Sequence, residues 1–172
     1  AMSGLMSITG GPDDLPGGGP AKVGLAICDV ITGIYSSFAV MTALAEREKS
    51  GVGQYIDMSL LDTTIAAISH INMNYLVGGI VPPRMGTGHP SIVPYQMFQA
   101  ADGPMVVAVG NNGQFEKLCQ ILGFPDLPRD ERFLTNPLRV QHRDALVPTL
   151  EAALVQKPVA YWIEQLTPQG VP

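Results

Sequence analysis

The sequence predicts a mixed α/β protein whose chain divides near residues 61–84. Three features support this prediction. A long apolar run over residues 23–49 precedes an alternating segment over residues 54–60, the periodicities of a helix and of a strand. Two short β-type runs, 95–100 and 105–109, flank a Gly-Pro turn signal. Helical patterns fill the rest of the chain, and no internal repeat is present.

The front part is predicted to be a loop followed by one helix. Gly and Pro recur over residues 1–22, which favours loop. The run over 23–49 is too long for a strand and ends at a Ser50-Gly51 stop signal, so we expect a buried helix. A transmembrane span is the alternative, but Asp29 lies inside the run, and a mid-span Asp costs about 3 kcal/mol. We therefore expect no membrane association.

Further elements follow in order. A strand over 54–60 and a second helix over 61–77 precede a Pro- and Gly-rich loop over 80–94, and then comes the hairpin. Asn111 or Asn112 is expected to cap a helix that ends at Gly123. Its predicted apolar stripe consists of Phe115, Leu118, Cys119 and Leu122.

Two more helices are predicted at the back. One covers about 137–156, with leucines at four-residue spacing, and Pro148 should kink or split it. The last covers about 158–166 and starts at Pro158, a favoured residue at a helix start. Its predicted buried face consists of Val159, Trp162, Ile163 and Leu166.

Composition excludes several functions. Of the 172 residues, 46% are apolar and 15% are charged, and the net charge is −5, which argues against nucleic-acid binding. Cys28 and Cys119 cannot supply a disulfide framework, and no secretory signal is evident, so a cytoplasmic location is expected. The three histidines lie far apart and no Cys-x-x-Cys occurs, so no metal site is expected. Phosphate-loop, dinucleotide and serine-elbow motifs are also missing.

Asp29 is the only carboxylate or basic side chain between Lys22 and Glu46. An ionised carboxylate buried without partners is very costly, so it must be neutral, paired, hydrogen-bonded or in a cleft. One interpretation is structural: backbone N–H groups of the first helical turn stabilise it. The other is functional: the carboxylate opens into a ligand crevice as a nucleophile or base.

Several segments together resemble a known family, the class III coenzyme A transferases (CaiB/BaiF family). The first is residues 19–33, which carry Asp29-Val30-Ile31-Thr32-Gly33. The others are residues 47–62, 86–95 and 101–103, then Asp130-Glu131-Arg132-Phe133 with Asn136 and Arg139, and finally 170–172. The resemblance covers essentially the whole chain. It implies that the chain is the middle of a protein more than twice as long.

The resemblance implies CoA transfer from an acyl-CoA to a free carboxylic acid. In such enzymes the aspartate at the position of Asp29 is the nucleophile. It forms a mixed anhydride with the acyl group and then an aspartyl–CoA thioester, which divides one hard exchange into easier steps. Coenzyme A enters as substrate and no metal takes part. The identity of the acids remains open.

The resemblance also assigns roles outside the helix. Gly86, Gly88 and His89 match the position of a Gly-rich loop that closes over the reactive intermediates; a plain turn and a structural histidine are the alternatives. Arg84 is a candidate contact to a CoA phosphate or a substrate carboxylate, with a solvated loop arginine as the alternative. Family CoA contacts come mostly from an N-terminal half outside this chain.

The implied fold is a large Rossmann-like domain plus a smaller α+β domain, in interlocked homodimers. Residues 1–60 map to the back of the large domain, 61–84 to a linker helix and loop, and 85–172 to most of the small domain. Two other functions stay open: α-methylacyl-CoA racemisation, and a non-catalytic scaffold. The 172-residue chain alone is not expected to be an active monomer.

Overall fold

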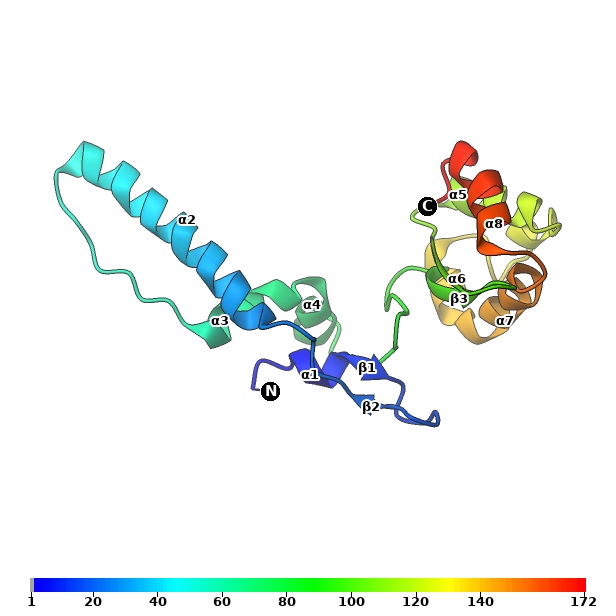
Figure 1. The fold of residues 1–172 in the computed structure, drawn as a ribbon, viewed down its shortest axis with the longest axis horizontal. Helices are drawn as coiled ribbons and strands as arrows, with labels where there is room; N and C mark the ends of the chain where they lie inside the picture. Colours follow the sequence, from blue (N-terminus) through cyan, green and yellow to red (C-terminus); the bar gives the residue numbers. More distant parts are fainter. Residues whose placement is uncertain (1) are drawn as a thin grey trace. The chain divides into compact units, whose positions relative to one another are not determined.

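The computed structural model describes residues 2–172, and backbone contacts divide the chain into two compact units, Ala1–Gly86 and Thr87–Pro172 (Figure 1). Each unit combines helices with one two-stranded antiparallel sheet. The predicted mixture of helix and sheet is thus confirmed. The boundary between the units falls at residues 86 and 87.

The first unit begins with short elements where a plain loop was predicted. Helix α1 covers Leu5–Ile8, and strands β1 (Gly10–Gly11) and β2 (Gly19–Pro20) pair with each other. Gly10 has φ 127°, and a Cβ there would lie 2.0 Å from the Gly19 carbonyl oxygen. The glycines that favoured a loop are therefore what lets these two strands approach so closely.

Helix α2 covers Ile27–Ser50, which confirms the predicted helix with a start four residues later. Gly51 ends it in the left-handed conformation, with its N–H donating to the Arg47 carbonyl at 2.8 Å. The expected burial is wrong for residues 2–172: no side chain of α2 is buried there, and Phe38 is 74% exposed. By length and apolar composition α2 could cross a membrane, a test that the core helix of a soluble protein also passes.

Residues 51–59 form no strand, so the prediction over 54–60 is wrong. An alternating segment becomes a strand only where another strand supplies hydrogen bonds, and the described residues offer none here. The predicted second helix is divided at Ser69, which has φ 52°. Helix α3 covers Leu60–Ile68 and packs against α2, and α4 covers His70–Leu76.

The second unit opens with the predicted hairpin, which is confirmed. Strand β3 covers Tyr95–Gln99 and β4 covers Pro104–Ala108, with Gln99 opposite Pro104. Helix α5 covers Asn112–Ile121, and the Asn111 side chain caps it by accepting from the Gln114 N–H at 2.9 Å. The predicted stripe is confirmed, since its four side chains are buried.

The back helices differ from the prediction in one respect. A break at His142 separates α6 (Asn136–Gln141) from α7 (Arg143–Leu154), while Pro148 lies inside α7. A proline removes only one helical hydrogen bond, and buried Leu146 and Leu150 hold α7 against the core on both sides of it. Helix α8 covers Val159–Leu166, and two short 3-10 turns cover Leu127–Arg129 and Thr167–Gln169. On the predicted face of α8, Trp162 and Leu166 are buried but Ile163 is exposed.

The second unit has a continuous apolar core. It is built from both strands, from α5, α7 and α8, and from Phe133 and Val171. Arg139 lies within it, 0% exposed, with its guanidinium 4.4 Å from the Phe115 ring centre. Burial lowers the pKa of Arg139 and raises the pKa of neighbouring Cys119 to about 12.

Candidate active site

Asp29 lies in the first turn of α2 and its side chain is exposed. The prediction that it is buried is wrong for this chain, because nothing in residues 2–172 covers that part of α2. No hydrogen bond or ion pair reaches its carboxylate from the described residues. The first-turn position places the carboxylate at the N-terminal end of α2, next to the backbone N–H groups that begin the helix.

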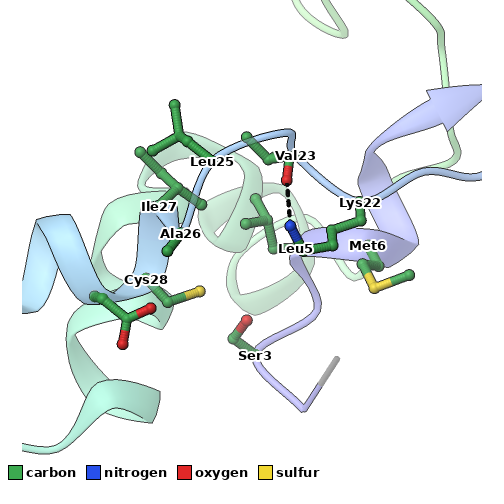
Figure 2. A pocket seen from close by; sticks show the side chains of 10 residues that line it. Ser3, Leu5, Met6, Lys22, Val23, Leu25, Ala26, Ile27 and Cys28 are labelled. Carbon is green, nitrogen blue, oxygen red and sulfur yellow. Dashed lines mark hydrogen bonds between the residues drawn. The ribbon is translucent and has the colours of Figure 1, made fainter.

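Asp29 lines a pocket of about 300 Å³ at the start of α2 (Figure 2). Most of the wall is apolar, and its polar members are Ser3, Lys22, Cys28 and Asp29. Lys22 donates from Nζ to the Val23 carbonyl at 3.0 Å, as the dashed line in Figure 2 shows. The pocket therefore combines a carboxylate and an ammonium group with a largely apolar surface.

A pair of hydroxyls joins the start of α2 to α3. Thr32 Oγ1 lies 2.6 Å from Thr63 Oγ1 and 2.7 Å from the Cys28 carbonyl oxygen, to which it can donate. Sequence reasoning included Thr32 in the motif but missed Thr63, which lies between Asp62 and Thr64. Only the contact across 31 residues reveals it.

Arg84 is engaged within the first unit. It donates from Nε to Asp13 Oδ1 at 2.9 Å, forms a second contact to that carboxylate through NH2, and donates to the Ser7 carbonyl at 3.1 Å. Arg84 is therefore not a solvated loop arginine, while its predicted contact to a CoA phosphate or a substrate carboxylate stays a prediction. Its charge fixes the loop around Asp13.

The candidate loop residues belong to different units. Gly86 is the last residue of the first unit, has φ 59°, and donates its N–H to the Gly10 carbonyl at 2.9 Å. Gly88 and His89 belong to the second unit. Their predicted role in closing over intermediates stays a prediction.

His89 is fixed within the second unit. Its backbone N–H donates to the Tyr95 carbonyl at 2.9 Å, and its ring stacks on the Tyr95 ring with 5.3 Å between the ring centres. Its Nδ1 accepts from the Ser91 N–H at 3.0 Å, which assigns the ring hydrogen to Nε2 in the neutral form. Arg143 donates to the His89 carbonyl at 2.6 Å.

Asn136 holds the next part of this segment from both sides. Its Oδ1 accepts from the Val93 N–H at 3.1 Å, and its Nδ2 donates to the Ser91 carbonyl at 2.8 Å. The sequence marked Asn136 as a family landmark without a role, and it gave no signal for Arg143. Both act across more than 40 residues, so the local pattern carries no trace of them.

The other family landmarks build the second unit. Arg139 donates to the Val93 and Phe133 carbonyls and to Asn112 Oδ1, at 2.8, 3.1 and 3.1 Å. Asp130 accepts hydrogen bonds from the backbone and side chain of Arg132, which lower the pKa of its carboxyl to about 2. Residues 2–172 contain no group of three or more His, Cys, Asp or Glu side chains that could hold a metal ion.

The chain belongs to CoA-transferase family III, whose family model matches residues 1–172. The resemblance seen in the sequence is thereby confirmed. The chain is 51% identical, over 142 residues, to a succinate–glutarate CoA-transferase of Agrobacterium fabrum, which covers 83% of this chain and 34% of that protein. It is 42% identical, over its whole length, to the succinyl-CoA:glutarate CoA-transferase of Homo sapiens, of which it spans 38%.

A solved structure supports the same assignment. A CaiB/BaiF family protein from Brucella suis matches 99% of this chain at 43% sequence identity and a TM-score of 0.73. The match spans 44% of that protein. The chain thus spans well under half the length of these relatives.

Proposed function

We propose that the protein transfers CoA from an acyl-CoA to a free carboxylic acid, with Asp29 as nucleophile. One observation carries the proposal: Asp29 of the Asp-x-x-Thr-Gly segment lines an apolar pocket at the start of α2. Membership of CoA-transferase family III supports it. A carboxylate that lines an apolar pocket has lone pairs available for attack on a thioester bound there.

The proposed reaction needs no external proton. An Asp29 carboxylate oxygen attacks the thioester carbonyl carbon, the C–S bond breaks, and CoA leaves as the thiolate. The thiolate attacks the Asp29 carbonyl carbon of the resulting anhydride, which releases the donor acid and leaves an aspartyl–CoA thioester. The acceptor carboxylate then repeats these two steps in reverse order. The product is the new acyl-CoA, and Asp29 is a carboxylate again.

The start of α2 also offers donors for the developing oxyanion. Backbone N–H groups in the first turn of a helix lack partners within the helix, and here they belong to residues beside the pocket. The apolar wall suits the acyl chain and the pantetheine arm, because it excludes water that would hydrolyse the anhydride. We assign no CoA contact to Arg84, because Asp13 already holds it.

Short dicarboxylic acids are the proposed substrates. Two of the relatives named above are transferases for succinyl-CoA or succinate with glutarate, at 51% and 42% identity. A third relative, from Acetobacter aceti, is an acetyl-CoA:oxalate CoA-transferase at 39% identity over 173 residues. We therefore propose a short dicarboxylate as donor, acceptor or both.

The uncovered α2 belongs, in our proposal, to a larger assembly. Residues 1–60 would form the back of a Rossmann-like domain, 61–84 a linker, and 85–172 most of a small domain. Interlocked cytoplasmic homodimers would cover the apolar side chains that α2 exposes. The loop with Gly86, Gly88 and His89 would close over the intermediates. Replacing both glycines by Ala is then expected to raise acyl-CoA hydrolysis relative to transfer.

Mass spectrometry of the full-length protein with succinyl-CoA tests the nucleophile. We expect a CoA-sized adduct on the Asp29 peptide, and its loss together with CoA transfer in Asp29→Asn. Asp62→Asn is the matched control, because Asp62 is the first-turn carboxylate of α3. Transfer that survives Asp29→Asn would exclude Asp29, and α-deuterium exchange without an adduct would indicate a racemase instead.

A further inference from the structure

The turn of α2 that carries Asp29 is fixed to α3 by polar contacts. Thr63 of α3 is 5% exposed, and its hydroxyl lies 2.6 Å from that of Thr32, one turn after Asp29. Helices α2 and α3 pack against each other, but no side chain of α2 is buried within residues 2–172. The hydroxyl pair is therefore the specific link between the two helices.

The two hydroxyls and their carbonyl acceptors form one line of hydrogen bonds. Each hydroxyl donates once. Besides the other hydroxyl, the acceptor for Thr32 is the Cys28 carbonyl at 2.7 Å, and the acceptors for Thr63 are the Ser59 carbonyl at 3.1 Å and, farther away, the Leu60 carbonyl at 3.3 Å. Either Thr63 donates to Thr32 and Thr32 donates to Cys28, or Thr32 donates to Thr63 and Thr63 donates to Ser59. Both arrangements connect the two hydroxyls.

The first arrangement, in which Thr32 donates to the Cys28 carbonyl, connects the hydroxyl pair to the backbone of the nucleophile. The Cys28 carbonyl and the Asp29 N–H share one planar peptide group, so a hydrogen bond to that carbonyl restrains the backbone of Asp29. At the other end, Ser59 is the N-cap of α3, where its Oγ accepts from the Asp62 N–H at 3.2 Å. The line thus ends on a capped, defined helix start.

We propose that Thr63 is a positioning residue for Asp29 and acts through Thr32. The inference rests on the proposed CoA transfer. In this proposal, the threonine of the Asp-x-x-Thr-Gly segment, Thr32, is needed for its hydrogen bond with the Thr63 hydroxyl of α3. A threonine on α2 alone could only bond back to its own helix, whereas the Thr32–Thr63 pair sets the register and rotation of α2 against α3.

Thr64 provides a matched control for Thr63. It is the next residue, it is 2% exposed, and its hydroxyl donates to the Leu60 carbonyl of its own helix at 2.7 Å. Thr64→Val therefore makes the same substitution at a similar depth, and the hydrogen bond that it removes lies within α3. Thr63→Ser keeps the hydroxyl and removes only a methyl group.

The test is steady-state kinetics of the full-length protein, with the yield and rate of the Asp29–CoA adduct. For Thr63→Val we expect kcat to fall about tenfold or more while KM changes about twofold or less, since misplaced nucleophiles lose rate rather than binding. The adduct should form more slowly by the same factor. Thr63→Ser and Thr64→Val should stay within about threefold of the parent protein.

A second pair of variants keeps the test decisive if Thr63→Val does not fold. Thr32→Val should lose kcat as Thr63→Val would, and Thr32→Ser should restore it. Where both valine variants fold, the double variant should be no slower than either one, because the two hydroxyls act as a unit.

Three results would overturn the proposal. They are equal losses in Thr63→Val and Thr64→Val, an unchanged kcat in Thr63→Val or Thr32→Val, and no rescue by serine. A failure of the underlying function looks different, because Asp29→Asn would then retain CoA transfer whatever the threonine variants do.

Discussion

The two units of the chain are held together in different ways. In Thr87–Pro172, apolar side chains from both strands and three helices close into one core. Within residues 2–86, the buried side chains are those of Thr63, Thr64 and Ile68, and α2 contributes none. Polar contacts, such as those between Thr32 and Thr63 and between Arg84 and Asp13, connect the segments of that unit instead.

This contrast shows which part of the fold is local. The apolar stripes of the second unit find their partners inside residues 87–172, whereas the described residues bury no side chain of α2, although α3 packs against it. Since polar contacts add only about 1 kcal/mol each, they cannot replace a core. The second unit is therefore expected to be stable by itself, and the first to depend on contacts with other chain segments.

Separating the two units should give the largest difference in stability between them. We expect residues 87–172, expressed alone, to unfold cooperatively in urea, and residues 1–86 to show no cooperative transition, because only the former encloses an apolar core. Near-ultraviolet circular dichroism and urea titration measure this. A monomeric 1–86 fragment with a sharp transition would remove the contrast between the units.

Removing the buried cation should disrupt the second unit strongly. Arg139→Met leaves the Val93 and Phe133 carbonyls and Asn112 Oδ1 without their donor. We expect the free energy of unfolding to fall by about 3 kcal/mol or more, since each buried unsatisfied group costs about 1–3 kcal/mol. Urea titration of the 172-residue chain measures the loss. The control Arg129→Met, at an exposed ion pair, should change little, and equal losses would contradict the assignment.

Truncating one apolar residue in each unit sharpens the comparison. Leu150→Ala removes a fully buried side chain of α7 and should cost about 3 kcal/mol in the 172-residue chain. Phe38→Ala removes a larger side chain from α2 and should cost less than about 0.5 kcal/mol, because Phe38 is exposed. Chemical denaturation of the monomer measures both. Comparable losses would show that α2 is covered in solution.

Asn136 fixes residues 91–93, the segment that precedes β3 in the second unit, through two hydrogen bonds. Asn136→Ala deletes both hydrogen bonds and should cost about 1–2 kcal/mol, whereas Asn136→Asp keeps the acceptor for the Val93 N–H. Amide hydrogen exchange should therefore accelerate at Val93 in the alanine variant and stay slow in the aspartate variant. Equally fast exchange in both would mean that Asn136 does not hold this segment.

The sequence predicted elements whose determinants are local. Helix α2, the hairpin and α5 follow from periodicity, a turn signal and an Asn cap, each readable within a few residues. The strand over 54–60 and the unbroken helix over 61–77 were wrong because a strand needs a pairing partner and the break at Ser69 needs tertiary contacts. The burial of α2 was inferred from its composition, and composition does not supply the surface that covers it.

The residues of the candidate site also divide into those that local sequence could predict and those that it could not. Asp29 could be found because a carboxylate inside an apolar run is costly, and because its motif resembles a family segment. Thr63, Asn136 and Arg143 could not, since their partners lie 31, 45 and 54 residues away in sequence. The ion pair of Arg84 could not be predicted for the same reason, as its partner Asp13 lies 71 residues away.

The smallest expected effect concerns the two cysteines, one in each unit. Burial raises the pKa of the Cys119 thiol from about 9 to about 12, so the folded state keeps a proton that the unfolded chain releases. This contribution to stability is fully present below the unfolded pKa, near 9, and is lost as pH rises from there through the folded value, near 12. Replacing Cys119 by Val should therefore reduce the decline of the urea midpoint between pH 9 and about 10.5. Cys28→Ser, in the pocket wall at the start of α2, is the control in the first unit. An unchanged decline in Cys119→Val would mean that the Cys119 thiol is not the group that titrates.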